Sequence, residues 1–270
     1  MAAAEASLLT IILLGIVEGL TEFVPVSSTG HLVLAGELLG FEGDAAGSFE
    51  IVIQLGAIMA VIVLYWRRFA GVVTGLSRFD PHALSFARNV MLGFLPSMVI
   101  GFFVYDYVKA MLDRPEIVAT ALIAGGIVML GVERLVPVPR WRSVESLSWR
   151  TALGIGVIQC LSMIPGVSRS GATIIGALSL GVERRTAAEY SFFLAVPTML
   201  AASTYDLIKS GGTFNEGAWM AIAIGFGVSF VVALVVIRWF IGIVSRMGFA
   251  PFAWYRIAIG VLALAWLAMR

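Results

Sequence analysis

One polar element of 28 residues occurs twice in a sequence that is otherwise strongly apolar. The copies read GIVEGLTEFVPVSSTGHLVLAGELLGFE at residues 15–42 and GVIQCLSMIPGVSRSGATIIGALSLGVE at residues 156–183, an ungapped offset of 141 with eight identical positions. Each copy contains an apolar helical run, a break rich in Pro, Gly and Ser, and a second apolar run. Interrupted helices at membrane depth line a site rather than face lipid. We therefore expect a polar site where the two breaks meet.

The composition indicates an integral membrane protein. Hydrophobic residues make up 60% of the chain and charged residues 13%, and the mean hydropathy is +0.97. Chains this apolar bury their surface in a bilayer. The formal net charge of +1 and the scattered Lys and Arg residues do not indicate a nucleic-acid partner, whereas membrane lipids are expected partners.

Six apolar segments are long enough to cross a bilayer, which takes about 17–25 residues. They lie at residues 50–66, 88–107, 116–134, 186–206, 218–240 and 253–269. The segments 7–40 and 150–181 each contain a central break, and their halves are too short to span. The sequence therefore predicts an all-α polytopic membrane protein with six transmembrane helices and two re-entrant helical hairpins, in one membrane domain over residues 1–270.

Basic residues predict the orientation, because Lys and Arg near helix ends favour the cytoplasmic side. Thirteen fall on one predicted side: Arg67, Arg68, Arg78, Arg88, Arg134, Arg140, Arg142, Arg150, Arg184, Arg185, Arg238, Arg246 and Arg256. Four fall on the other: Lys109, Arg114, Lys209 and Arg270. Both termini are thus expected outside. Three spans per half make the halves, about 1–140 and 141–270, inverted repeats whose site opens to the periplasmic or extracellular face.

The two copies differ in the chemistry of their breaks. The first carries Glu18 and Glu22, four residues apart and therefore on one helical face. It continues with hydroxyl groups, a glycine and a histidine: Ser27, Ser28, Thr29, Gly30 and His31. The second has Gln159 and Met163 at the glutamate positions, and then offers Ser168, Arg169, Ser170 and Gly171. Acids, hydroxyls and a guanidinium brought together are what a phosphoester site requires.

Structural roles compete with these functional ones. Ser27, Ser28 or Thr29 could cap the second half-helix, since Ser and Thr are favoured at that position. His31 could be a hydrogen-bonded core residue, and Arg169 could pair with a buried carboxylate. Ionisable groups inside a membrane segment are costly, however, and usually functional. Pro25 and Pro165 are expected to act only as helix breakers.

The two motifs resemble the signatures of a known family. Glu18 and Glu22 followed by SSTGH, and PGVSRSG at residues 165–171, are similar to those of the undecaprenyl-diphosphate phosphatases of the bacitracin-resistance type, over essentially the whole chain. The resemblance implies a bacterial plasma (inner) membrane enzyme that hydrolyses undecaprenyl diphosphate to the monophosphate and inorganic phosphate. This reaction recycles the lipid carrier of peptidoglycan synthesis. A membrane pocket with a lateral opening suits such a polyprenyl diphosphate.

For this reaction we expect Ser28 to be the nucleophile and Arg169 to hold the phosphate oxygens. Either His31 or Glu22 would act as the general base. Glu18 and Glu22 would bind a divalent cation, with Mg²⁺ expected and Ca²⁺ as the alternative. The remaining expected substrate-binding positions surround these groups at the two breaks: Ser27, Thr29, Gly30, Gly166, Ser168, Ser170, Gly171 and Thr173.

Two alternatives stay open. Inverted repeats with broken helices are typical of secondary transporters, in which Glu18, Glu22 and His31 would relay ions and Arg169 would bind an anion. A lipid flippase with a midplane anion site is the other. The glycines Gly225, Gly227 and Gly242 fit either internal packing or the contacts of a homodimer, because small residues allow close helix approach.

Overall fold

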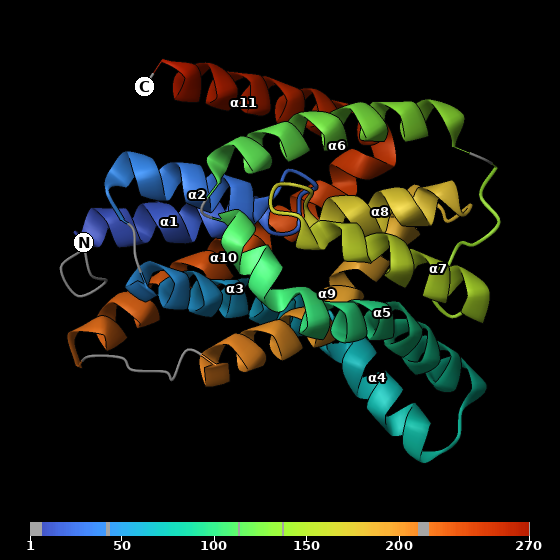
Figure 1. Cartoon of the computed structure of the whole chain (residues 1–270). Helices are drawn as coiled ribbons and strands as arrows, with labels where there is room; N and C mark the ends of the chain where they lie inside the picture. Colours follow the sequence, from blue (N-terminus) through green and yellow to red (C-terminus); the bar gives the residue numbers. More distant parts are fainter. Residues whose placement is uncertain (1–6, 42–43, 113, 137, 210–215, 270) are drawn as a thin grey trace.

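The computed structural model describes residues 7–41, 44–112, 114–136, 138–209 and 216–269 as a bundle of helices (Figure 1). Within these residues the regular structure is helical, apart from one isolated β-bridge between Trp141 and Val182. The elements are α1 (Leu8–Thr21), α2 (Ser28–Leu39), α3 (Asp44–Leu64), α4 (Trp66–Ser77), α5 (Pro81–Leu112), α6 (Pro115–Leu135), α7 (Trp149–Gln159), the 3₁₀ helix η1 (Cys160–Met163), α8 (Arg169–Ser179), α9 (Arg184–Lys209), α10 (Glu216–Met247) and α11 (Ala250–Ala268).

Helices from opposite halves of the chain pack in pairs. Helix α1 lies against α10, α7 lies against α5, and α6 lies along α11 at the top of the view (Figure 1). Small residues permit these contacts. A Cβ atom added at Gly19 would lie 2.7 Å from the Ser229 carbonyl oxygen, and one at Gly260 would lie 2.8 Å from the Ala119 carbonyl oxygen. Close helix packing, rather than long connections, therefore joins the two halves.

Four helices are long and apolar enough to cross a membrane by themselves. They are Pro81–Leu112, Pro115–Leu135, Trp219–Met247 and Ala250–Ala268. The segment predicted at 50–66 differs, because the chain bends by 71° between Phe49–Leu64 and Trp66–Ser77, and this bent pair would make a fifth span. The described part of the chain thus contains four or five candidate spans. The six-span count stays a prediction.

Helix α9, which contains the predicted span 186–206, is less apolar because it occupies the centre of the bundle. Tyr190, Ser191 and Phe192 are fully buried, and the ring of Phe192 packs edge-on against Phe23 with centroids 5.4 Å apart. A helix enclosed by protein has little lipid contact, so its sequence can carry hydroxyl groups that a lipid-facing helix would avoid. This position brings α9 alongside both helix breaks.

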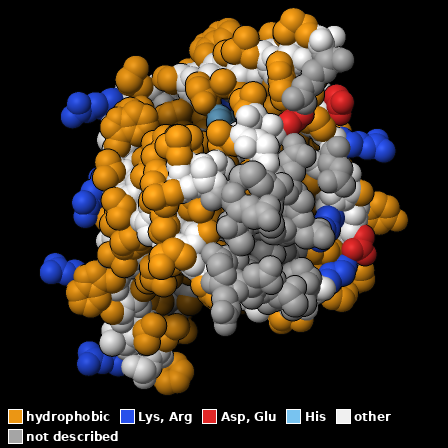
Figure 2. Space-filling view, turned by 90° about the vertical axis from the view of Figure 1, so that its left-hand side faces the viewer, with side chains coloured by type: hydrophobic (Ala, Val, Ile, Leu, Met, Phe, Trp, Pro, Cys, Tyr) orange, Lys and Arg blue, Asp and Glu red, His pale blue; other side chains and the backbone are white. Residues whose placement is uncertain are grey.

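The molecular surface is mostly apolar, as expected for contact with lipid. Figure 2 shows hydrophobic side chains over much of one face, with Lys and Arg near its margins. Large apolar side chains such as Phe103, Val235 and Trp239 are more than half exposed. A protein surface this apolar would promote aggregation in water, whereas a bilayer accommodates it.

Three of the basic residues predicted on one side, Arg68, Arg88 and Arg184, make contacts in or near the connection between α6 and α7. Ion pairs join Arg184 to Glu133 at 2.6 Å and Arg68 to Glu145, so the first links α9 to α6 and the second links α4 to the connection between α6 and α7. At the start of α5, the Arg88 guanidinium donates to the Leu147 carbonyl of the same connection. This grouping agrees with the predicted basic side. The direction in which it faces stays a prediction, and residues 1–6 and 270, at the termini, lie outside the described residues.

Both predicted helix breaks are present, and they share an unusual backbone. Helix α1 ends at Thr21 before α2 begins at Ser28, and η1 ends at Met163 before α8 begins at Arg169. Ser27 has φ 73° and Ser168 has φ 76°, a region that residues other than glycine rarely adopt. Each side-chain oxygen caps the next helix, accepting from Gly30 N at 3.3 Å and from Gly171 N at 3.1 Å. Ser27 therefore caps α2, and the Ser28 hydroxyl is not used for capping.

Candidate functional site

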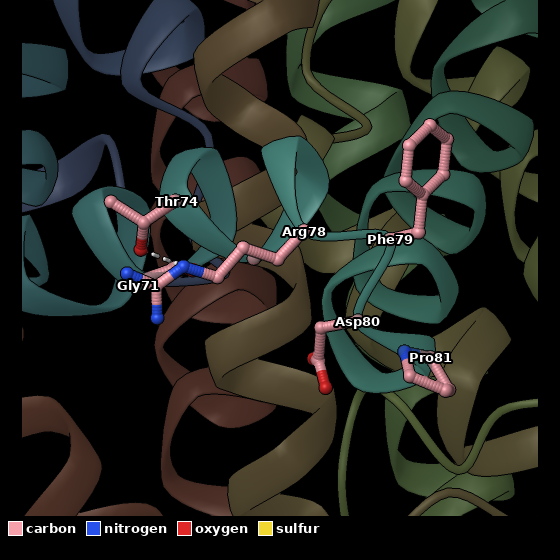
Figure 3. Close-up of a pocket in the computed structure, with 7 residues that line it drawn as sticks. Gly71, Thr74, Arg78, Phe79, Asp80 and Pro81 are labelled. Carbon is pink, nitrogen blue, oxygen red and sulfur yellow. Dashed lines mark hydrogen bonds between the residues drawn. The ribbon is translucent and has the colours of Figure 1, made fainter.

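Two hollows in the described part of the chain are candidate sites. The first lies at the turn between α4 and α5 and is drawn in Figure 3, where Arg78, Phe79 and Asp80 point in different directions. Thr74 donates to the Gly71 carbonyl oxygen at 3.1 Å, and Asp80 accepts from Ala83 N at 2.8 Å, so two of its polar groups serve the local helices. This hollow has no converging set of reactive groups.

The second hollow lies where the two helix breaks meet. Side chains from α3, η1, α9 and both breaks line it: Glu22, Ser27, Ser28, Thr29, Gln54, Ser162, Pro165, Gly166, Ser168, Arg169, Thr198, Met199 and Ala202. A hydrogen bond also links the breaks directly, because Ser170 Oγ donates to the Val24 carbonyl oxygen at 3.0 Å. The structure thus forms one polar pocket from segments about 140 residues apart in the sequence.

Three predicted catalytic side chains form a continuous chain in this pocket. The Ser28 hydroxyl donates to Glu22 Oε2. The other oxygen, Glu22 Oε1, accepts from Arg169 Nη2 at 2.8 Å, and both residues of this ion pair are largely buried. Helix α1 thereby presents a carboxylate between a hydroxyl group and a guanidinium that begin two separate half-helices. A carboxylate bound to a serine hydroxyl is placed to accept its proton.

Arg169 is held by groups besides Glu22. Its Nη1 donates to the Ser191 carbonyl oxygen at 2.8 Å and to Ser191 Oγ at 3.3 Å, and the guanidinium lies over the ring of Phe23 at 5.6 Å. Its Nε is buried and has no hydrogen-bond partner in the described part of the chain. Arg169 is therefore oriented by α9, and its Nε is a donor that these contacts do not use.

His31 faces away from the Ser28–Glu22 pair. Its Nδ1 lies 2.7 Å from the Ser27 carbonyl oxygen, and its Nε2 lies 2.9 Å from the hydroxyl of Tyr255 on α11. The two rings stack with an interplanar angle of 4°. Because both ring nitrogens have partners, Glu22 rather than His31 is in contact with the predicted nucleophile. The sequence did not indicate Tyr255, which lies 224 residues further along the chain.

Several predicted substrate-binding residues support the pocket instead of lining it. Thr173 is fully buried, and its hydroxyl lies within hydrogen-bond distance of two acceptors, the Arg169 carbonyl oxygen at 2.8 Å and Gln159 Oε1 at 3.1 Å. Ser170 Oγ lies 3.1 Å from Ser168 Oγ in its own break and donates to the Val24 carbonyl oxygen of the other, so Ser170 bridges the two breaks. Gly30 and Gly171 supply the capped amides. The residues lining the pocket include Ser27, Thr29, Gly166 and Ser168.

Glu18 fits the chemistry expected of a cation ligand. It is fully buried one helical turn before Glu22, and neither carboxylate oxygen has a hydrogen-bond partner among the described residues. Such a carboxylate is costly unless it meets a cation or a proton. No group of three His, Cys, Asp or Glu residues suited to a metal occurs in the described ranges. A bound divalent ion would therefore need oxygen atoms from substrate or water besides Glu18 and Glu22.

The structure corrects the prediction for Arg256, which the sequence placed among the basic residues at the cytoplasmic helix ends. Its side chain is 1% exposed and reaches the carbonyl oxygens of both helix breaks. Twelve basic residues remain in that group. The sequence did contain an indication that Arg256 is special, because it lies within the predicted span 253–269, where a cationic side chain is unusual. Gln54, Ser191 and Thr198 are further polar contributors to the site that the sequence did not indicate.

Fold and site together define the class: a polytopic membrane protein whose polar centre lies between two interrupted helices and joins a serine, a glutamate and an arginine. A family model described as bacitracin resistance protein BacA matches residues 11–262, and the chain belongs to this family. It is 64% identical over 98% of its length to the undecaprenyl-diphosphatase of Rhizorhabdus wittichii, which is covered completely. It is 59% identical to that of Sphingopyxis alaskensis, with 97% of this chain and 99% of the relative covered.

Proposed function

We propose that this protein is an integral membrane phosphatase that hydrolyses undecaprenyl diphosphate to undecaprenyl phosphate and inorganic phosphate. Relatives of nearly the same length carry the name undecaprenyl-diphosphatase. The observation that carries the proposal in the structure is the buried contact chain from Ser28 through Glu22 to Arg169. A serine, a proton acceptor and an anion-binding cation are the minimum set for covalent phosphoryl transfer.

In the first step, Ser28 Oγ attacks the terminal phosphorus while its proton passes to Glu22. The bond from that phosphorus to the bridging oxygen breaks, and undecaprenyl phosphate leaves. In the second step, water attacks the phosphoserine and releases inorganic phosphate, which regenerates the Ser28 hydroxyl. We assign the base role to Glu22 because it contacts Ser28, whereas His31 contacts Ser27 and Tyr255.

Arg169 links substrate binding to this proton transfer. In the structure it pairs with Glu22 at 2.8 Å, so the carboxylate is shared between a cation and the serine. A diphosphate entering the pocket carries more negative charge than Glu22 and would compete for the guanidinium. Glu22 would then be left in contact with Ser28 alone.

Backbone amides would complete the anion site. Ser27 and Ser168 are the N-caps of α2 and α8, so both helices begin at the pocket. The first amides of a helix lack carbonyl partners and carry a partial positive charge, which favours phosphate oxygens. Ser27, Thr29, Gly166 and Ser168 would bind the substrate from these positions, while Ser170, Gly171 and Thr173 hold the second break in place.

We propose a divalent cation as a cofactor, with Mg²⁺ expected. Glu18 would hold it, because both of its buried oxygens lack partners in the described ranges. When bound, the ion would neutralise charge on the diphosphate. The chain itself would still supply the nucleophile and the base. The two carboxylates alone do not distinguish Mg²⁺ from Ca²⁺.

For the topology, we propose two inverted repeats, 1–140 and 141–270, with six spans and two re-entrant hairpins. The matching backbone of Ser27 and Ser168 supports this arrangement. The reciprocal packing of α1 on α10 and α7 on α5 supports it as well. In this arrangement hairpin one enters from outside, and the pocket opens to the periplasmic or extracellular face of the plasma membrane.

Cysteine labelling tests this orientation. In a Cys160→Ala background, single cysteines at positions 27–31 should react with an impermeant maleimide added outside intact cells. A cysteine replacing Arg142, in the basic connection between α6 and α7, should react only after permeabilisation. The reverse pattern would refute the proposed orientation.

The experiment for the proposed function measures inorganic phosphate released from undecaprenyl diphosphate by the detergent-purified protein. We expect turnover that a chelator abolishes and that added Mg²⁺ restores. Turnover unaffected by the chelator would remove the cation from the proposal and leave the serine mechanism. No release from folded protein would instead favour the transporter or flippase, for which the broken helices alone would suffice.

A further inference from the structure

Arg256 on α11 connects the two helix breaks. Its guanidinium donates to five backbone carbonyl oxygens that come from three parts of the chain. Nη1 reaches Pro25 at 3.1 Å and Val167 at 2.9 Å, Nη2 reaches Gly166 at 3.0 Å and Ala121 at 3.3 Å, and Nε reaches Leu122 at 3.4 Å. An arginine has five N–H groups. Each of them therefore has an acceptor, and the acceptors lie in break one, break two and α6.

The arrangement is specific for a guanidinium. Among the ion pairs of the described residues, none involves Arg256, so carbonyl dipoles alone compensate its buried charge. A lysine ammonium has three donors at one point and cannot reach acceptors spread around a planar fork. Apolar side chains at this position would leave carbonyl oxygens in both breaks unsatisfied, which is unfavourable in a buried site.

Glycines make room for this side chain. A Cβ added at Gly125 on α6 would overlap Arg256 Nη2, and one at Gly171 would lie 2.9 Å from Arg256 Nη1. By contrast, a Cβ at Gly131, on the same helix as Gly125, would meet no atom within 4 Å among the described residues. The space around the guanidinium is thus defined by small residues of α6 and α8.

The contacts also fix the direction of a peptide group at the pocket. A trans peptide is planar, with its carbonyl and N–H pointing in opposite directions. Because Arg256 holds the carbonyl of Val167, the N–H of Ser168 in the same peptide unit points away from Arg256. Ser168 lines the pocket next to Arg169.

We propose that Arg256 is a positioning residue that joins the two breaks and holds the Ser168 amide toward the substrate as an additional donor. It does not touch the reacting atoms. Its predicted effect on catalysis rests on the proposed phosphatase function, whereas its effect on the mutual position of the breaks does not. Loss of the contact should therefore lower kcat more than it raises KM, because an anion-stabilising amide acts most strongly on developing charge.

The test compares Arg256→Lys and Gly125→Ala with wild type and with the control Gly131→Ala. Gly125→Ala keeps Arg256 and its charge but displaces the guanidinium. This variant therefore distinguishes the effect of where the guanidinium lies from the effect of its charge. We expect kcat to fall at least tenfold in both test variants, with KM changed less than threefold, and no change in the control. Hydrogen exchange should be faster in residues 23–29 and 164–170 of both test variants, in protein whose thermal transition remains cooperative.

Phosphate release and hydrogen exchange together distinguish a failure of the proposed phosphatase function from a failure of the proposed role of Arg256. If wild type released no phosphate but exchange at both breaks increased in the variants, the phosphatase function would fail and the joining role would stand. Normal kcat with unchanged exchange in either test variant would refute the role of Arg256. Faster exchange without a change in kcat would refute the alignment of the Ser168 amide.

Discussion

Replacing Ser28 by alanine is expected to reduce phosphate release from undecaprenyl diphosphate by at least about 1,000-fold, because the substitution removes the nucleophile. The fold should persist. Ser28 is buried, but its hydroxyl contributes one hydrogen bond, and Glu22 keeps its ion pair with Arg169 in the variant. The measurement is single-turnover phosphate release by purified protein, together with the thermal transition in detergent.

Ser179→Ala is a matched control for this prediction. Its hydroxyl donates to the Ile175 carbonyl oxygen at 2.8 Å at the far end of α8, so the same atoms are removed away from the pocket. This variant should retain wild-type turnover. Rapid acid quenching of wild type should also yield phosphate attached to the peptide that contains Ser28. Hydrolysis by Ser28→Ala at more than about a tenth of the wild-type rate would mean that water attacks directly and that the serine only binds substrate.

Much of the site could be predicted because it follows from local sequence. A break containing Pro, Gly and Ser ends an apolar helix wherever it occurs, so both interruptions were evident before any contact was known. The repeat then implied that the breaks meet, and the structure places Ser170 of one break against Val24 of the other. The resemblance at Glu18, Glu22 and residues 165–171 added the substrate, in agreement with the relatives found.

What the sequence did not indicate depends on side-chain directions and on contacts between distant segments. Whether His31 or Glu22 meets Ser28 depends on the side-chain directions across a break, and Tyr255 pairs with His31 only because α11 packs nearby. Arg256 is a second example. An arginine near a predicted helix end looks the same in the sequence whether its side chain is exposed or, as here, donates to buried carbonyl oxygens. Counting charges by position assumes that they are exposed.

The glycines illustrate this limit for packing. Gly225 was compatible with either an internal contact or a subunit contact, and a Cβ there would lie 2.6 Å from the Phe49 ring, so it serves internal packing. Gly227 and Gly242 would meet no atom within 4 Å in the described part of the chain. For these two glycines the subunit contact stays a prediction, because small residues on a helix allow either role and sequence alone does not separate them.

Arg169→Lys is expected to lower kcat by about 100-fold or more, because the lysine keeps the charge but loses the planar fork. Arg169 uses Nη1 for the Ser191 carbonyl and Nη2 for Glu22, and its Nε is the donor without a partner among the described residues. A single ammonium cannot remain on Ser191 and also bind two phosphate oxygens. Steady-state kinetics on undecaprenyl diphosphate would measure the loss.

The control is Arg185→Lys on α9, where the guanidinium is exposed and pairs with Glu189 one turn away at 3.2 Å. An exposed pair of this kind contributes little to stability, so turnover should be unchanged. If Arg169→Lys also kept near-normal turnover, Arg169 would act only as a point charge, and the planar shape of its guanidinium would not contribute to catalysis. If Arg169→Lys lost its thermal transition as well, Arg169→Gln would separate the two effects. A glutamine retains donors toward Ser191 but leaves Glu22 without a cation, so a folded Arg169→Gln protein with wild-type turnover would contradict a role for this charge in phosphate transfer.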